Sequence, residues 1–231
     1  MEEKENKKKR KLVVLVNPSA GNESYINYLS MKFDVTVVDA KKYNNESLDL
    51  ILFTGGEDVN PKYYNQETGR YTAINIERDK FERDYMFDRF PNVPKLGICR
   101  GSQFVTVMSG GKLVQHVNGH AIGKLHELSF KKPYFGGVFN ITSTHHQMMF
   151  PYNLKEEDYS IVATSKYFLS NTYLNGNNNE TELPKGFEEC EIVFYPKYNA
   201  LGIQGHPEMP NCPADTKDFC LLLIQKILKL Y

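Results

Sequence analysis

The sequence predicts an α/β fold of three layers, in which helices flank a mostly parallel central sheet. Short apolar runs typical of strands alternate with amphipathic segments typical of helices through the first half of the chain. Three polar, glycine-containing motifs each follow directly after such a strand. In open parallel sheets, functional groups gather at the carboxyl ends of strands, so this placement supports the same architecture.

The expected helices each carry an apolar stripe. The helix over 77–90 places Phe81, Tyr85 and Phe90 on one face and ends before Pro91. A last amphipathic helix is expected over 215–230. The remaining elements are strands near 12–16, 34–38, 48–53, 95–98, 138–142, 161–165, 190–195 and 200–204, and helices near 23–31 and 101–109.

Length and charge predict one domain over 12–231, preceded by a charged tail over 1–11. Lys plus Arg equals Asp plus Glu, at 28 each, so no net field attracts nucleic acid or anionic lipid. The basic run from Lys7 to Lys11 is interleaved with acids nearby, which favours a solvated tail over a binding or localisation signal.

The chain is expected to be cytoplasmic. No apolar run approaches the ~18 residues of a membrane span, and nothing at the N-terminus resembles a secretory signal. Four cysteines, at 99, 190, 212 and 220, form no CxxC pair, so neither a zinc ribbon nor a redox motif is indicated. No metal and no cofactor is expected. An Asn-rich stretch near 171–185 is expected to be a loop, either a lid or, as we favour, sequence drift.

Cys99 lies in the run Leu96-Gly97-Ile98-Cys99-Arg100-Gly101-Ser102-Gln103, where a strand meets a helix. Small residues on both sides are what a nucleophile on a tight strand-to-helix turn requires. The N-terminus of the following helix favours a thiolate, and the backbone N–H of Arg100 is predicted to face an oxyanion. A buried structural cysteine is the alternative interpretation.

His206 and Glu208 follow the apolar run over 200–203. Residues two apart in an extended chain project to the same side, so the carboxylate can hold one imidazole nitrogen and leave the other free. Together with Cys99 they supply a nucleophile, a base and an orienting carboxylate. A lone His before Pro would more often be a loop residue.

Gly55 and Gly56 follow a third strand, in the run Gly55-Gly56-Glu57-Asp58-Val59-Asn60-Pro61. Paired glycines let backbone N–H groups approach a ligand closely, so Gly56 is predicted to be the second oxyanion donor and Gly55 to line the substrate. Taken alone, a Gly-Gly pair after a strand is most often a turn.

These motifs, with Ser143-Thr144-His145-His146-Gln147, resemble those of class I glutamine amidotransferases. Within that family the chain is most similar to the gamma-glutamyl-gamma-aminobutyrate hydrolases, the C26-type cysteine peptidases. The likeness spans about residues 12–230 and includes weaker matches at Arg78-Asp79 and Phe81-Glu82. Thr142 departs from the branch, which commonly has Asn there; this departure bears on substrate choice.

The resemblance implies a flavodoxin-like class I glutamine amidotransferase fold and hydrolysis of a gamma-glutamyl amide through a thioester. It places Gln103, Ser143, His145 and His146 beside the substrate, although His146 could equally make a structural hydrogen bond. The Arg100 side chain is expected either to recognise a carboxylate on the leaving amine or to form a surface ion pair.

Two other functions stay open. One is a glutaminase component that passes ammonia to a synthase, which requires a partner protein because these 231 residues contain no synthase domain. The other is a non-catalytic binding protein on the same fold, against which the Cys, His and Glu argue. Glutamine or a gamma-glutamyl compound is the expected small-molecule partner.

Overall fold

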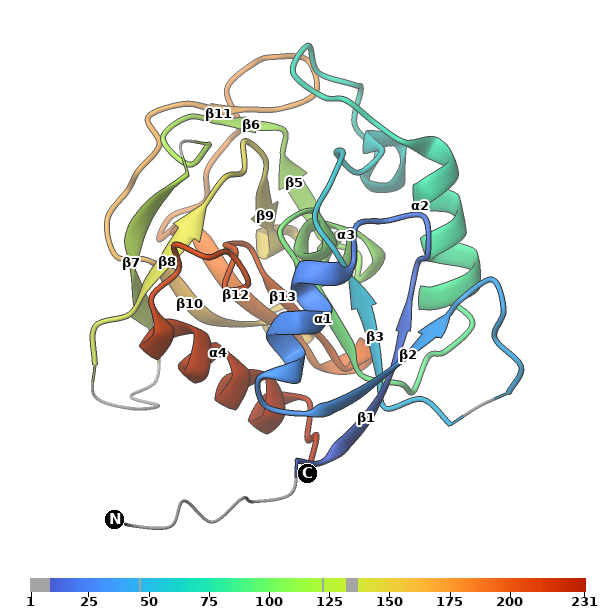
Figure 1. Ribbon diagram of the computed structural model, residues 1–231. Coiled ribbons are helices and arrows are strands. Elements are labelled where there is room, and N and C mark those ends of the chain that lie inside the picture. Colours follow the sequence, from blue (N-terminus) through green and yellow to red (C-terminus); the bar gives the residue numbers. More distant parts are fainter. Residues whose placement is uncertain (1–8, 46, 122, 132–136) are drawn as a thin grey trace.

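The computed structural model describes residues 9–45, 47–121, 123–131 and 137–231 (Figure 1). Most of the charged tail expected over 1–11 therefore lies outside the described residues. The remainder forms a nine-stranded sheet in the order β2-β1-β3-β4-β13-β12-β10-β7-β8, covered by helices. The predicted α/β class is confirmed.

The sheet has a parallel half and an antiparallel half. The parallel half comprises β2 (Asp34–Asp39), β1 (Lys11–Val16), β3 (Leu50–Phe53), β4 (Lys95–Ile98) and β13 (Ala200–Ile203). The motifs that contain Gly55, Cys99 and His206 follow strands of this half. The antiparallel half adds β12 (Cys190–Tyr195), β10 (Ser160–Ser165), β7 (Lys124–Phe130) and β8 (Asn140–Ser143).

Successive side chains along the strands pack alternately into two apolar clusters, one on each face of the sheet. On β1, Val14 packs in the cluster that includes α1 (Glu23–Ser30) and α4 (Ala214–Ile227), whereas its neighbour Leu15 packs in the opposite cluster. That second cluster includes Phe104 of α3 (Arg100–Met108). Because successive strand residues point to opposite faces, the apolar strands are covered on both sides, and the three layers follow.

Shorter elements fill the edges of the molecule. The strand pairs are β5 (Lys112–Val114) with β9 (Met148–Phe150), and β6 (His116–Val117) with β11 (Tyr173–Leu174). Single 3₁₀ turns are η1 (Pro61–Tyr64), η3 (Pro151–Asn153), η4 (Glu156–Asp158) and η5 (Pro196–Tyr198).

The helix expected over 77–90 is α2 (Ile76–Glu82) followed by a π turn, η2 (Arg83–Phe87). The wider turn shifts the buried face by about one residue. Met86 and Phe87 therefore enter the core, while Tyr85 is 53% exposed. The predicted apolar stripe is wrong at Tyr85 for this reason.

Strand β7 is absent from the strands that the sequence predicts. Its inward positions include His126, which is a buried polar residue rather than an apolar one. Alternation of apolar and polar residues is the signal for a half-buried strand, and a buried imidazole weakens it.

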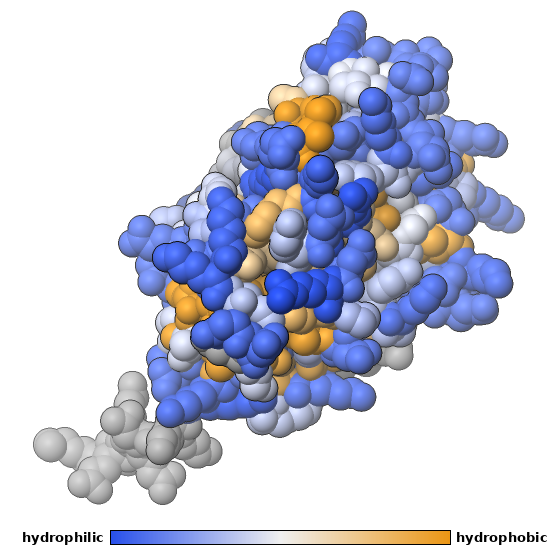
Figure 2. Space-filling view, turned by 90° about the vertical axis from the view of Figure 1, so that its right-hand side faces the viewer, coloured by the Kyte–Doolittle hydropathy of each residue, from blue (hydrophilic) through white to orange (hydrophobic). Residues whose placement is uncertain are grey.

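The Asn-rich segment is attached to the body of the protein. It contains β11, and the side-chain oxygen of Asn178 accepts a hydrogen bond of 3.0 Å from the backbone of Arg70. One face of the molecule is shown in Figure 2, where hydrophilic residues predominate and apolar side chains form small separate groups. Within the described residues, every helix is too short or too polar to span a bilayer.

Candidate active site

Cys99 occupies the turn between β4 and α3. Its φ of 55° and ψ of −114° are unusual for a residue with a side chain. The turn is held because the Cys99 N–H donates to the carbonyl of Ile203 at 2.9 Å and the Cys99 carbonyl accepts from the Ser102 hydroxyl at 2.7 Å. Strained backbone that the surroundings enforce is common at functional sites.

Two glycines make this turn possible, as the sequence predicts. A Cβ at Gly97 would lie 2.2 Å from the carbonyl oxygen of Gly101. A Cβ at Gly101 would lie 2.0 Å from the carbonyl oxygen of Phe53 on β3. Both contacts are with backbone, which cannot move aside. The strand-to-helix turn at Cys99, termed the elbow below, therefore requires glycine at each position.

His206 and Glu208 lie in the loop after β13. Their side chains meet with His206 Nδ1 2.6 Å from a Glu208 carboxylate oxygen, and both side chains are buried. The backbone N–H of His206 donates to the Thr142 carbonyl at 2.8 Å, which ties the loop to β8. The predicted pairing of the two residues is present.

Gly55 is where these groups converge. A Cβ placed there would lie 3.5 Å from the His206 ring and 3.7 Å from Cys99 Cβ, so the two side chains lie on one side of this glycine. The same Cβ would lie 2.6 Å from the Tyr25 hydroxyl, which accepts the Gly55 N–H at 3.1 Å. No motif in the sequence marks Tyr25, since it is brought here from α1 by tertiary packing.

The charges around His206 favour its imidazolium form. Burial opposes that form, but contacts with Cys99 and Glu208 outweigh it and raise the pKa of His206 to about 10. Burial also raises the pKa of Tyr25, and the neighbouring Glu208 and Cys99 add to the effect. Tyr25 therefore stays a neutral phenol beside the other three groups.

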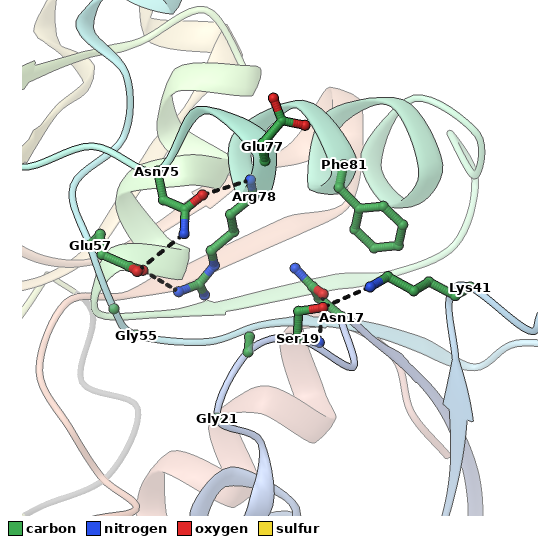
Figure 3. A pocket seen from close by; sticks show the side chains of 12 residues that line it. Asn17, Ser19, Gly21, Lys41, Gly55, Glu57, Asn75, Glu77, Arg78 and Phe81 are labelled. Atoms are coloured by element: carbon green, nitrogen blue, oxygen red, sulfur yellow. Dashed lines mark hydrogen bonds and ion pairs between the residues drawn. The ribbon is translucent and has the colours of Figure 1, made fainter.

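An open pocket of about 850 Å³ reaches this junction from one side (Figure 3). Arg78 and Phe81 extend into it from α2, while Ser19 and Lys41 come from the loops that follow β1 and β2. The pocket is lined by Asn17, Ser19, Ala20, Gly21, Lys41, Gly55, Gly56, Glu57, Asn75, Glu77, Arg78 and Phe81. A second hollow, of about 640 Å³, lies against Tyr25 and also reaches Gly55.

Gly56 adopts a φ of 142°, and a Cβ there would lie 2.1 Å from the Arg78 guanidinium. That guanidinium also donates to the Thr54 carbonyl at 2.9 Å and to Glu82 at 2.9 Å. Arg78 thus braces the loop that carries the glycine pair.

The side chain of Arg100 has neither of its expected positions. It is 2% exposed, and its guanidinium bonds to both Asp79 and Glu82 inside the protein. The alternatives of a surface ion pair and of a carboxylate-binding group on the substrate side are therefore both wrong. The elbow turns this side chain inward, toward the acids of α2, although its backbone N–H remains at the start of α3.

Replacing Arg100 by Met is expected to lower the free energy of unfolding by about 3 to 5 kcal/mol, because Asp79 would remain buried without its cation and Glu82 would keep only Arg78. The check is urea unfolding of Arg100→Met. Arg83→Met is the matched control, since it removes a half-exposed ion pair with Asp84 that should contribute little to stability. Equal losses in the two variants would contradict a buried structural role.

The remaining predicted site residues are bonded to protein groups. Gln103 donates to the Gln147 carbonyl at 3.0 Å, Ser143 donates to the His120 carbonyl at 2.8 Å, and His145 Nδ1 lies 2.8 Å from the Gln147 carbonyl. All three side chains are buried.

His146 is the more accessible of the paired histidines, and its Nε2 lies 3.2 Å from Asp58. The hydrogen bond that the His146 ring donates to the Asp58 carboxylate raises the pKa of His146. This contact is consistent with the second alternative given for His146 in the sequence analysis, a structural hydrogen bond.

The other cysteines are buried thiols. Burial raises the pKa of Cys190 to about 12 and that of Cys212 to about 11, and it raises the pKa of Cys220 as well. They are unpaired, and raised pKa values make them poor nucleophiles. Cys99, in contrast, lies beside His206, and its interaction with the ring helps to raise the pKa of that histidine.

Known proteins resemble this chain in sequence. The model of the Peptidase C26 family matches residues 34–167. A glutamine amidotransferase-like protein of Rickettsia prowazekii is 37% identical over 92 residues, which are 38% of this chain and 32% of that protein. The protein NtpR of Enterococcus hirae is 25% identical over 179 residues, which are 74% of this chain and 71% of that protein. The chain thus spans about a third of the Rickettsia relative.

Solved structures share the fold. A GMP synthase component from Thermoplasma acidophilum superposes with a TM-score of 0.62 at 16% identity, and the match covers 95% of each chain. PurLQS from Thermotoga maritima gives a TM-score of 0.56 at 20% identity, covering 93% of this chain and 98% of that one. At such identities the likeness establishes the architecture alone.

The match of the family model extends over more than half of the chain and includes Cys99 with both flanking glycines. The Rickettsia relative is described as glutamine amidotransferase-like, which agrees with the resemblance seen in the motifs. The chain is a member of the Peptidase C26 family.

Proposed function

We propose that the protein hydrolyses gamma-glutamyl amide bonds, with Cys99, His206 and Glu208 as the catalytic residues. The observation that carries the proposal is their arrangement: a cysteine on a glycine-enforced elbow, and a histidine held by a carboxylate at 2.6 Å, with the cysteine and the histidine both against Gly55. Membership in a family of cysteine hydrolases supports the same chemistry.

The proposed hydrolysis begins with Cys99 as thiolate and His206 as imidazolium. The Cys99 thiolate attacks the amide carbonyl carbon, and the backbone N–H groups of Arg100 and Gly56 receive the negative oxygen. As the C–N bond breaks, His206 gives its proton to the departing amine, and a thioester remains. Water then attacks the thioester with His206 as base, which releases the gamma-carboxylate and restores the thiolate. Glu208 holds the ring throughout.

The pocket beside Gly55 supports a substrate with a sizeable amine. Its volume of about 850 Å³ exceeds what ammonia needs, and its walls carry both Lys41 and Glu77. We also propose, as the resemblance implies, that Gln103, Ser143, His145 and His146 lie beside the substrate. The buried hydrogen bonds of Gln103, Ser143 and His145 hold the Ser143–Gln147 segment in place. The thiol chemistry suits a reducing compartment, because disulfide formation would block Cys99.

The second candidate is a glutaminase component that delivers ammonia to a synthase. The observation in its favour is that the fold is shared with a component of a GMP synthase. A partner with ATP-dependent synthase activity would then be required.

The test is a panel of gamma-glutamyl amides, with glutamine included, assayed on the isolated protein. We expect an amide with an alkyl amine to give a higher kcat/KM than glutamine. Glutamine as the best substrate, with turnover that depends on an added synthase, would replace this proposal with the second candidate.

A further inference from the structure

Two histidines and a glutamate lie close together near the Ser143–Gln147 segment, and the proposed hydrolysis uses none of them. His120 lies between β6 and β7, His126 is on β7, and Glu191 is on β12; these three residues are termed the His–Glu cluster. All three are buried, with exposures of 0%, 8% and 0%. One nitrogen of each histidine and one oxygen of Glu191 all lie within 4.8 Å of one another.

The spacing of these atoms suits a metal ion. One oxygen of Glu191 lies 3.0 Å from His126 Nε2 and 3.7 Å from His120 Nδ1. In a tetrahedral zinc site with bonds of about 2.0 to 2.1 Å, neighbouring ligand atoms lie about 3.4 Å apart. The two distances bracket that value, so an ion requires only small side-chain shifts.

The side chains of Glu191 and His126 lie close to each other, but their polar atoms lack well-oriented hydrogen bonds. Both carboxylate oxygens of Glu191 and both ring nitrogens of His126 are buried without an oriented hydrogen bond from the described part of the chain. A buried carboxylate is costly unless donors or a cation compensate it. A bound cation would compensate Glu191 and use the lone pair of His126 at once.

The groups around His120 orient its ring so that one nitrogen can bind a metal ion. Its Nε2 lies 3.2 Å from Glu189, a carboxylate that also accepts the N–H groups of Leu169 and Ser170 at 2.8 and 2.9 Å. A carboxylate on one imidazole nitrogen fixes the tautomer and leaves the other nitrogen for a metal. Ser143 lies 3.3 Å from Nδ1 but donates its proton to the His120 carbonyl, so that lone pair stays available.

We propose that the His–Glu cluster binds one divalent transition-metal ion, and that zinc is the ion its donors fit best. Two imidazoles and one carboxylate are typical zinc ligands, whereas magnesium and calcium take oxygen donors. The ion joins β7 to β12 across β10 and anchors the loop of His120. The His120 ring lies 4.5 Å from that of His145, so the anchored loop supports the Ser143–Gln147 segment from behind.

The test measures zinc in the Cys99→Ser protein, so that the reactive thiol cannot supply the ligand. We expect one zinc per chain after gel filtration, and a cobalt-substituted form with the absorption of nitrogen and oxygen ligands. Glu191→Gln and His126→Gln in the same background should bind zinc at least about tenfold more weakly, by competition with a chromophoric chelator. His116→Gln, which changes a histidine outside the cluster, is the control and should keep full affinity.

Three outcomes would overturn the proposal. The first is a Cys99→Ser protein that retains no zinc and whose Tm does not change when zinc is added. The second is binding that survives both cluster substitutions. The third is a cobalt spectrum with thiolate charge transfer, which would place the ion at a cysteine. The cobalt spectrum and the Tm need no substitution in the cluster, so they decide the matter even if the cluster variants fail to fold.

Discussion

Cys99→Ser is expected to fold normally and to lose gamma-glutamyl amide hydrolysis by about 10³-fold or more. A hydroxyl has a far higher pKa than a thiol, so it is not ionised beside His206, and removal of a nucleophile from a triad typically has this effect. Serine also fits the elbow, because it adds no atom to a turn with no spare room at Gly97 and Gly101. The measurement is kcat on the best amide of the panel, with Tm as the check on folding.

Cys212→Ser is the matched control for this variant. Cys212 is also a buried, unpaired cysteine, but burial raises the pKa of its thiol to about 11. Its replacement should leave kcat within about twofold, because changes away from the reacting atoms rarely affect chemistry. Comparable losses in the two variants would show that the effect is not specific to Cys99.

His206→Ala is expected to cost nearly as much activity as Cys99→Ser, whereas Glu208→Gln should cost roughly ten- to a hundredfold less. His206 must both give and take a proton, while Glu208 only orients and stabilises the imidazolium. The test is kcat of the two single variants and of the double variant. The losses in the double variant should be far from multiplicative, since the residues act as a unit.

The charge on His206 adds a pH dependence to the same prediction. Its raised pKa keeps the imidazolium through neutral pH, and the proton is lost as the pH rises through about 10. The wild-type rate should therefore decline on the alkaline side as that proton is lost.

A Glu208→Gln enzyme as inactive as Cys99→Ser would contradict the assignment of Glu208 to orientation alone.

Local sequence patterns were sufficient to predict the strands of the parallel half and the elbow. The glycines at 97 and 101 are dictated by a turn between adjacent elements, so their role is visible in a few consecutive residues. The pairing of His206 with Glu208 is also local, because the two residues are two apart in the chain. The specific catalytic roles remain predictions.

Features formed between distant segments could not be predicted in this way. Arg100 pairs with acids about twenty residues earlier, and Tyr25 reaches Gly55 from a separate helix. The sequence pattern does not predict strand β7, because its buried position at His126 is polar and that residue meets Glu191 only in the assembled sheet. No periodicity within one segment encodes such contacts.

The most direct test of the central claim is mass spectrometry after reaction with a glutamine-like electrophile. Attack by Cys99 on a bound gamma-glutamyl group predicts one label per chain, located on the peptide that contains Cys99 and abolished by Cys99→Ser. Gamma-glutamyl substrate should protect the thiol from labelling. A label on Cys190 or Cys212 in place of Cys99 would contradict the account.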